Sequence, residues 1–542
     1  MRWIAIALAA VGSGGLAAAP AVDARPTHPA DQVVLVLDHG VVERHRDPRD
    51  PALELPSRPG GSRAPGGRAR AARSTASPPP SFAAQLDRLL ASGAIDRPTR
   101  DRYRQSLLAA RRSLGRLSGT RRVELGAVLT NLERIAAAGM LTPSRLPALV
   151  LTLERNRQWW TTGPLLGDGQ RVGFAGSGLV WEYYAGQGIE IQWLGTFGKA
   201  NGYFLGGRGN DGELRALLDE ALGLATQRAG GIAWEYDFRF DGGAPPWVSG
   251  LAQGTAVQVL ARAAVRFTRA DYFNAAHAGL GVFEAAPPEG VRVATAAGAH
   301  YLIYSFAPRE RVLNAFIQAL VGLHDYAGLA NSDDGRALFA AGEAEARLEV
   351  PQYDTGAWSL YDQSTESDLG YHTLLRDFLA HLCQRLRFPG STVQASAASA
   401  GPPPGTAAGP SGGTPPTPPA TGPTPPATAP SPDVYCTTAD HFTAYVHQPP
   451  TIAIAAAGPD RAGRPVRLRL ALSKISEVTL TASRAGQTVY RMTEQLGHGT
   501  RMVVWHPAQP GRYGLSASAT DLAGNSAAAG AAVTVAPAAK HR

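Results

Sequence analysis

Apolar residues recur every three to four positions along most of the chain between residues 81 and 386. This spacing is typical of helices that bury one face. We expect a helical preamble over residues 81–160, and Thr142-Pro143 opens its last helix. Further helices are predicted over residues 214–225, 250–267, 271–280, 308–326, 335–348, 372–386 and 439–446. Short polar loops between paired helices favour an incomplete α/α toroid, which is a barrel of helical pairs.

The end of the chain changes to a period of two. Val466, Leu468, Leu470 and Leu472 alternate with Arg or Ala, and turn sequences separate the later segments. This pattern predicts an Ig-like or fibronectin-like β-sandwich over residues 449–536, with a tail at 537–542. The fold class is therefore multidomain α+β. The sandwich suits either a spacer or a binding module.

Three shorter segments also alternate. Residues 33–37 read as a lone strand, and residues 291–305 as a hairpin with Gly298 near its turn. Residues 234–240 read as a strand that places Glu235, Asp237 and Arg239 on one face.

Two segments have no period at all. Residues 25–80 scatter arginines among Gly, Pro and Ser, which predicts a disordered basic linker. Its arginines suit either a tether to acidic wall polymers or plain solvated disorder. Residues 389–433 are so rich in Pro, Gly and Thr that they cannot bury a core, and they should form an extended, disordered spacer.

Charge and the N-terminus indicate where the protein acts. The net charge of +8 suits an acidic polymer as partner, or nonspecific adhesion. Arg2, the apolar residues 3–19 and a small-residue site at Val22–Ala24 predict a signal peptide over residues 1–24. The alternative is an uncleaved anchor helix. We expect an exported protein, secreted or cell-wall associated, with no membrane span after cleavage and no nucleic-acid partner. Its oligomeric state is open.

Several aromatic and amide residues are candidates for holding a sugar ring. Trp247 precedes the helix at 250–267, where Ser249 and Gln253 lie one turn apart. Tyr184 and Gln187 lie in a second aromatic-rich segment, residues 181–204. An aromatic ring beside a hydroxyl or amide often binds a sugar, but the same residues suit a helix start or an ordinary core.

Four motifs occur in a family order: PPWVSGLAQG at 245–254, YDTG at 353–356, LYD at 360–362 and YHT at 371–373. Together they resemble the C-terminal catalytic domain of the D-glucuronyl C5-epimerases, enzymes that act on heparosan-type polysaccharides. The resemblance covers about residues 180–386. It implies an α/α toroid, which we place at residues 161–448.

The resemblance implies three catalytic tyrosines. Tyr304 lies ten residues before Asn314 of a V-L-N helix start, Tyr361 is in LYD and Tyr371 opens YHT. Each would otherwise read as a core residue. The substrate-binding candidates are Tyr184, Gln187, Arg239, Trp247, Gln253, Asn314, Tyr353 and His372. We expect at least one of Arg239, His372, Arg309 and Arg311 to face the tyrosines, His372 first.

The implied reaction removes the proton on C5 of a uronyl residue and returns one to the opposite face. It needs a base, an acid and stabilisation of the enediolate, and we expect no cofactor. Two tyrosines can serve if one is a phenolate, which requires lowering its pKa by about 3 units with a nearby cation. No metalloprotease, P-loop or dinucleotide motif has a fitting context, and the histidines show no ligand spacing, so no catalytic metal is predicted.

The sequence departs from the family pattern at two positions. A catalytic Glu precedes the first tyrosine in the family, and Ile303 stands there here; Gly370 replaces an Asp before YHT. The loop between LYD and YHT is shorter, and the N-terminal β-sandwich of the animal enzymes has no counterpart. Two other functions therefore stay open: a uronate lyase, because β-elimination starts with the same proton, and an inactive glycan-binding wall protein.

The two cysteines, Cys383 and Cys436, flank the Pro-rich spacer. Export implies an oxidising compartment, where an even number of cysteines favours pairing. The resemblance places a last toroid helix after the spacer, so we interpret the spacer as an insertion between two adjacent helices. We therefore predict a Cys383–Cys436 disulfide and a domain boundary near residue 449, against the alternative of two free buried thiols.

Overall fold

The computed structural model describes residues 33–46, 80–388, 431–456 and 460–537. The predicted signal peptide, most of the basic linker, nearly all of the Pro-rich spacer and the end of the tail lie outside these residues. The chain divides into two compact units, residues 1–247 and residues 248–542, which we describe separately.

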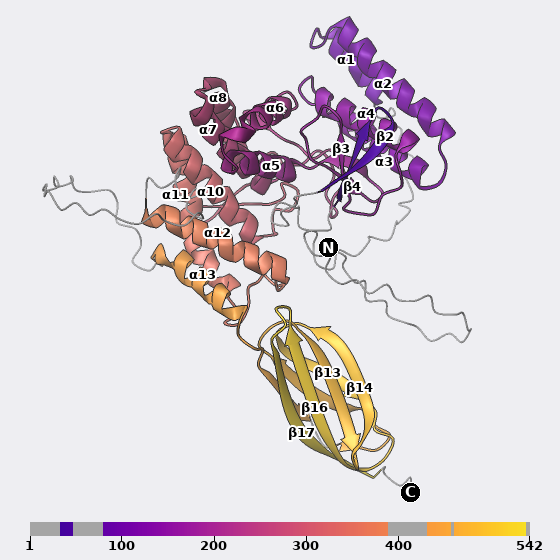
Figure 1. Ribbon diagram of the computed structural model, residues 1–542, viewed down its shortest axis with the longest axis vertical. Coiled ribbons are helices and arrows are strands. Elements are labelled where there is room, and N and C mark those ends of the chain that lie inside the picture. Colours follow the sequence, from indigo (N-terminus) through magenta and orange to yellow (C-terminus); the bar gives the residue numbers. More distant parts are fainter. Residues whose placement is uncertain (1–32, 47–79, 389–430, 457–459, 538–542) are drawn as a thin grey trace, which may run out of the picture. The chain divides into compact units, whose positions relative to one another are not determined.

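Helices, one mixed sheet and a separate two-stranded hairpin make up the described part of the first unit (Figure 1). Its helices are α1 (Phe82–Ala91), α2 (Arg97–Arg116), α3 (Gly119–Ala137), α4 (Leu146–Thr162), α5 (Trp193–Leu205), the short η3 (Arg208–Asn210) and α6 (Asp211–Leu222). The first two begin where the sequence supplies a cap: Ser81 Oγ accepts from the amide of Ala84, and Asp96 from that of Thr99. Helices thus run through most of residues 81–160, as their apolar spacing predicts.

The sheet of this unit has the order β2-β1-β3-β4-β5. Its strands are β1 (Val33–Asp38), β2 (Val41–Arg46), β3 (Arg171–Phe174), β4 (Trp181–Tyr184) and β5 (Gly188–Ile191), and a separate hairpin joins β6 (Thr226–Arg228) to β7 (Gly231–Ala233). The strand expected at residues 33–37 is present, but it does not stand alone. It forms a hairpin with β2 and pairs in parallel with β3.

The predicted strand at residues 234–240 is wrong. Only isolated bridges form there, between Tyr236 and Trp247 and between Phe240 and Gly243. The rings of Tyr236, Phe238 and Phe240 pack on Trp247, and no continuous ladder of backbone hydrogen bonds forms.

The second unit begins with a helical part. Its helices are α7 (Gly250–Phe267), α8 (Ala270–Ala278), α9 (Gly281–Glu284), α10 (Leu313–Leu329), α11 (Asp333–Glu349), the short η4 (Val350–Tyr353), α12 (Leu369–Arg387) and α13 (Asp433–Tyr445), with a hairpin of β8 (Arg292–Ala294) and β9 (Ala299–Tyr301). Gly254 of α7 faces the backbone of α10 so closely that an added Cβ would lie 2.8 Å from Ala319 Cα. The glycine lets the two helices pack backbone to backbone.

A disulfide joins α12 to α13. Cys383 and Cys436 are bonded, with their Cα atoms 5.2 Å apart, so the predicted pair is confirmed. The two helices lie side by side (Figure 1). The strands that end the chain begin only at Ile452, after α13.

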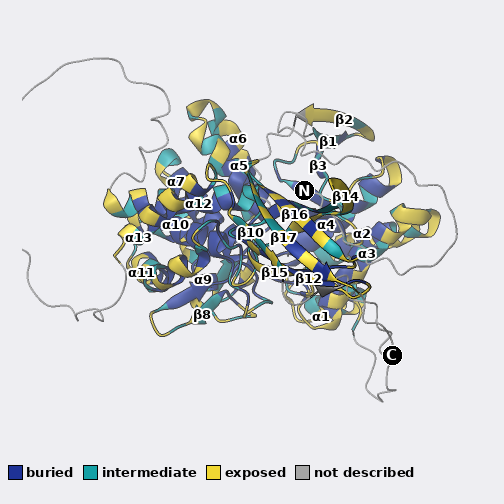
Figure 2. Ribbon diagram, turned by 90° about the horizontal axis from the view of Figure 1, so that it is seen from below, coloured by how far each residue is buried: buried dark blue, intermediate teal, exposed yellow. Residues whose placement is uncertain are grey.

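Two sheets, here called the C-terminal sheet pair, form the rest of this unit. Their orders are β10-β12-β15 and β11-β17-β16-β13-β14. The strands are β10 (Ile452–Ala456), β11 (Asp460–Arg461), β12 (Val466–Leu472), β13 (Ser476–Arg484), β14 (Gln487–Leu496), β15 (Gly499–Trp505), β16 (Gly511–Asp521) and β17 (Ser526–Ala536). Burial alternates along β12 and β16, as Figure 2 shows. Buried side chains of both sheets form one apolar cluster, so the sheet pair has its own core.

No helix among the described residues is both long and apolar enough to span a bilayer.

Candidate active site

The three predicted catalytic tyrosines lie on segments that hydrogen bonds hold together. The amide of Leu313, which follows the turn after Tyr304, donates to the carbonyl of Tyr361 at 3.4 Å. Gln363, two residues after Tyr361, adds two further hydrogen bonds between the same segments. Its Nε2 donates to Arg309 O at 2.7 Å, and its Oε1 accepts from the amide of Arg311 at 3.1 Å. Residues about 50 positions apart in sequence are thereby fixed side by side.

Tyr361 lies at the centre of the cluster. Its ring centroid is 5.2 Å from that of Tyr371, and its side chain is buried. Burial raises the pKa of Tyr361 well above its usual value, and the negative charges that Tyr304, Tyr371 and Glu310 would carry raise it further. Tyr361 is therefore held as a neutral phenol, which suits a proton donor.

The other two tyrosines differ in exposure. Tyr304 is fully buried and stacks on Phe306 with ring centroids 5.2 Å apart. Tyr371 is half-buried in the first turn of α12, where its amide donates to Asp368 Oδ1 at 2.8 Å. Of the three rings, that of Tyr371 is the most accessible to solvent and substrate.

The hydroxyl of Tyr361 and Nδ2 of Asn314 are buried in this region and have no hydrogen-bond partner among the described residues. Asn314 uses its Oδ1 to accept from the amide of Ala315 at 2.8 Å, which orients the side chain at the start of α10. Buried polar groups are normally paired, so an unpaired one calls for an explanation such as a catalytic role or a bound water or ion.

The cations predicted to stabilise a phenolate are engaged elsewhere or exposed. Arg311 pairs with Glu345 at 3.1 Å and also with Glu349. Arg309 is exposed on the turn after Tyr304. Neither arrangement places a buried positive charge beside the Tyr361 hydroxyl.

His372 is part of the core. It is fully buried and stacks on Trp358 with ring centroids 3.8 Å apart. Its Nδ1 accepts from the amide of Ser359, and Nε2 donates to the carbonyl of Phe442 at 2.9 Å, so both nitrogens are bonded and the ring is neutral. Burial lowers the pKa of His372 to about 4. The expected cationic role beside Tyr371 does not fit this placement, because burial disfavours the charged ring.

Three other candidates from the motifs have structural partners. Trp247 is buried against Tyr236 and donates from Nε1 to Phe238 O at 2.9 Å. Gln253 donates to the carbonyl of Gly279 at 3.0 Å, and the Tyr353 hydroxyl to that of Arg311 at 2.8 Å. Ser249, which was paired with Trp247 as a sugar contact, caps α7.

Tyr184, Gln187 and Arg239 form a small group in the first unit. Gln187 Oε1 accepts from the amide of Arg239 at 3.1 Å and from Asn131 Nδ2 at 3.2 Å. The ring of Tyr184 packs on Phe238, with centroids 4.6 Å apart. Arg239 is exposed, and Tyr184 is half-buried.

The strand prediction placed Glu235, Asp237 and Arg239 on one face, but the structure buries Glu235 and exposes Arg239. Glu235 is buried, with Arg145 at 2.5 Å and Arg228 at 2.6 Å. Burial and the Glu235 charge raise the pKa of Asp237 to about 8, although both arginines oppose this shift.

We predict that Asp237 makes stability fall with pH. Its pKa in the folded protein exceeds the unfolded value of about 3.9, so its contribution is complete below that value and is lost as pH rises towards 8. Asp237→Asn should therefore gain unfolding free energy relative to the wild type between pH 5 and pH 8 in urea titrations. Glu213→Gln, at an exposed position, should show no such trend. An Asp237→Asn difference that stays constant with pH would contradict the shift.

Glu310 is the acidic residue that the sequence did not single out. It is buried within the turn that joins Tyr304 to α10, where its amide donates to Ala307 O at 3.0 Å. Its charge acts on Tyr361, which places the carboxylate near the tyrosine cluster. A lone Glu in an irregular turn has no periodic signal, so only its position between two arginines, Arg309 and Arg311, could have drawn notice.

Among the described residues, no group of three or more His, Cys, Asp or Glu side chains is arranged to hold a metal ion.

Comparisons with known proteins agree with the motifs. A family model described as the D-glucuronyl C5-epimerase C-terminus matches residues 228–386, which include all three tyrosines. A D-glucuronyl C5-epimerase from Caenorhabditis elegans is 31% identical over 131 residues, covering 22% of this chain and 21% of that protein. The chain thus spans about a fifth of the length of this curated relative.

Solved structures are more distant. The endo-beta-1,4-glucanase CMCax of Acetobacter xylinum is 14% identical, with 35% of this chain and 66% of that chain covered and a TM-score of 0.25. An engineered protein is 20% identical over 19% of this chain and 27% of its own, with a TM-score of 0.14. Neither likeness bears on the fold. Residues 228–386, which carry the tyrosine motifs, are thus similar to the C-terminal part of the D-glucuronyl C5-epimerases, and a curated member of that group resembles 22% of the chain.

Proposed function

We propose that this chain is an exported isomerase that inverts C5 of D-glucuronyl residues in an acidic, heparosan-like polysaccharide. The observation that carries the proposal is the meeting of Tyr304, Tyr361 and Tyr371, from three separate motifs of the family segment, where the buried Tyr361 hydroxyl has no hydrogen-bond partner among the described residues. The net charge of +8 favours a polyanionic substrate.

The proposal extends to the architecture. We assign residues 161–448 to an incomplete α/α toroid that the disulfide closes, since α13 returns to pack on α12. The C-terminal sheet pair is assigned to an Ig-like fold, on the basis of its two sheets and common core. The signal peptide and the secreted or wall-associated location remain proposals from the sequence.

In the reaction, the C5–H bond breaks, its proton passes to a base, and the electron pair moves into the carboxylate as an enediolate. A proton from an acid on the opposite face then forms the new C5–H bond. Tyr361 suits the acid, because burial keeps its hydroxyl protonated. Asn314 Nδ2 is available to donate a hydrogen bond to the negative oxygens that develop.

The base is better supplied by a carboxylate than by a phenolate. A phenolate would need a nearby cation, whereas the neighbouring Glu310 makes a phenolate at Tyr361 harder to form. Ile303 occupies the position of the family's catalytic Glu and is fully buried. We assign the base to Glu310, on the same turn and seven positions later.

Proton exchange at C5 tests the function. Wild-type protein is incubated with heparosan in D₂O, and NMR and mass spectrometry follow deuterium at C5. Deuterium at C5 without chain cleavage supports the isomerase. Absorbance from a 4,5-unsaturated product would instead make the protein a lyase, and binding without exchange would make it an inactive glycan-binding protein.

We predict that Glu310→Gln lowers the exchange rate by about 100-fold or more, the usual scale for losing a general base. Gln keeps the size of the side chain and removes its ability to accept the proton. Glu310→Asp should retain more activity than Glu310→Gln. The matched control is Glu284→Gln, an exposed residue at the end of α9. Full activity in folded Glu310→Gln would return the base role to a tyrosine.

A further inference from the structure

Tyr361 lies in a short hairpin, residues 359–367, which we call the Tyr361 hairpin. The amide of Tyr361 donates to Thr365 O at 2.7 Å, and the amide of Ser367 donates to Ser359 O at 3.0 Å. Leu360 and Glu366 form a bridge across it. The turn is closed by Asp362, whose Oδ1 accepts from the amide of Thr365 at 2.8 Å. The position of the Tyr361 ring therefore depends on where this hairpin is held.

The carboxylate of Glu366 joins the hairpin to the C-terminal sheet pair. Glu366 Oε1 accepts from the amide of Ile475 at 2.7 Å, and Oε2 accepts from the amide of His498 at 2.7 Å. These donors lie on two different loops, between β12 and β13 and between β14 and β15. The side chain is 5% exposed, so both bonds are charge-assisted and shielded from water.

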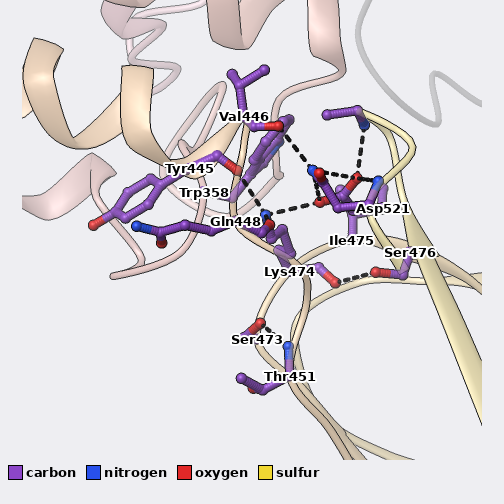
Figure 3. A network of polar contacts seen from close by, with 12 residues as sticks. Trp358, Tyr445, Val446, Gln448, Thr451, Ser473, Lys474, Ile475, Ser476 and Asp521 are labelled. Carbon is purple, nitrogen blue, oxygen red and sulfur yellow. Dashed lines mark hydrogen bonds and ion pairs between the residues drawn. The ribbon is translucent and has the colours of Figure 1, made fainter. Parts of the chain in front are cut away.

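Lys474 makes a second connection beside the first (Figure 3). Its Nζ lies 2.9 Å from Asp521 Oδ2 and donates to Tyr445 O at 2.8 Å and also to Gln448 O. The lysine side chain is 1% exposed, and that of Asp521 is fully buried. Removing a charge from water is costly unless it is paired and hydrogen-bonded; Asp521 and the two carbonyls supply these partners to the Lys474 ammonium.

The lysine also reaches the base of the hairpin. Its Nζ lies 5.3 Å from the centroid of the Trp358 ring, within the range of a cation–π contact. Trp358 stacks on His372 and donates from Nε1 to Ser367 O at 2.8 Å. The same ring thus links the sheet pair, the hairpin and the helix that carries Tyr371.

We propose that the C-terminal sheet pair is a positioning module for Tyr361, with Glu366 and Lys474 as its positioning residues. A spacer domain would need contacts only with α13 and the connection that follows it. Here the sheet pair has its own core, yet two of its loops donate hydrogen bonds to the carboxylate of Glu366. Glu366 pairs across the hairpin with Leu360, the residue directly before Tyr361. The effect on catalysis rests on the proposed function. That the sheet pair holds the Tyr361 hairpin in place does not depend on it.

The test uses the full-length protein with Glu366→Ala, Glu366→Gln and the control Glu477→Ala, an exposed carboxylate on β13. Hydrogen–deuterium exchange is followed on peptides that cover residues 359–367 and 473–498. Glu366→Ala should raise exchange at least about tenfold in both places. Glu366→Gln keeps an acceptor oxygen and should raise it less, and Glu477→Ala should leave it unchanged.

Activity supplies the second readout. Glu366→Ala should lower kcat by about 10- to 100-fold with little change in KM or in the pH profile, because misplacing a reacting group slows chemistry without altering its titration. The double variant Lys474→Met/Asp521→Asn removes the second connection without leaving a lone buried charge, and should act in the same direction. If Glu366→Ala folds and shows wild-type exchange over residues 359–367, the proposal is overturned. If the wild type lacks C5 exchange but the hairpin loosens, the positioning holds and the proposed function fails.

Discussion

Replacing Tyr361 with phenylalanine is expected to lower C5 proton exchange by about 100-fold or more while leaving the fold intact. The substitution keeps the ring, which packs against Tyr371, and removes only the hydroxyl. That hydroxyl is buried and has no hydrogen-bond partner among the described residues. Its loss therefore breaks no hydrogen bond to the described residues, and it removes the proton that the proposed mechanism delivers to C5.

Stability should move in the opposite direction from activity. A buried hydroxyl without a partner lowers stability, so Tyr361→Phe should unfold at the same urea concentration as the wild type or at a higher one. Tyr353→Phe is the matched control from the neighbouring motif. Its hydroxyl donates to the carbonyl of Arg311 at 2.8 Å, so this variant should lose about 1 kcal/mol of stability and retain more activity.

The pair of variants separates chemistry from structure. Exchange is measured by mass spectrometry on heparosan in D₂O, and stability by urea titration of the same samples. The role assigned to Tyr361 fails if folded Tyr361→Phe exchanges C5 protons at the wild-type rate. Tyr304→Phe and Tyr371→Phe in the same assay then show which of the three hydroxyls, if any, takes part.

The motifs predicted which tyrosines meet, but not their charge states. The order of V-L-N, LYD and YHT was enough to select Tyr304, Tyr361 and Tyr371. The pKa of Tyr361 depends instead on burial and on Glu310, which is distant from it in sequence. A single sequence does not show which residues lie close together in space, so it does not decide whether Tyr361 is a phenol or a phenolate.

Aromatic residues posed the same difficulty. Trp247 and His372 carry the chemistry of a sugar site, and both are core residues here. The partner that settles the role of His372 is the carbonyl of Phe442, 70 residues away and beyond the Pro-rich segment. Periodicity, in contrast, reports local burial, which is why the alternation in β12 and the helices before residue 160 were predicted well.

Long-range pairing also explains the strand error near the N-terminus. Residues 33–37 were expected to stand alone because their neighbours in sequence are linker-like. Their parallel partner is β3, with Leu35 paired to Val172. Parallel strands are joined by a long connection rather than a tight turn, so no turn sequence predicts that these two strands pair.

Removing the disulfide is expected to have the largest effect on stability. The bond between Cys383 and Cys436 closes a loop with a sequence separation of 53 residues. In the chain-entropy model, a loop of this length stabilises the folded state by about 4 kcal/mol, because the crosslink restricts the unfolded chain. The Cys383→Ser/Cys436→Ser variant should lose about this much unfolding free energy in urea, with a matching fall in the midpoint.

The loss should also spread beyond α13. That helix supplies the Phe442 carbonyl to His372 and the Tyr445 carbonyl to Lys474, so it underlies both the YHT helix and the docking of the sheet pair. Reducing the wild type with dithiothreitol provides an independent route to the same state without a substitution, and peptide mapping reports the bond. Hydrogen exchange in α13 should rise in the double variant and in the reduced wild type alike. If both unfold within about 1 kcal/mol of the oxidised protein, the packing of α13 on α12, rather than the crosslink, holds the end of the helical part closed.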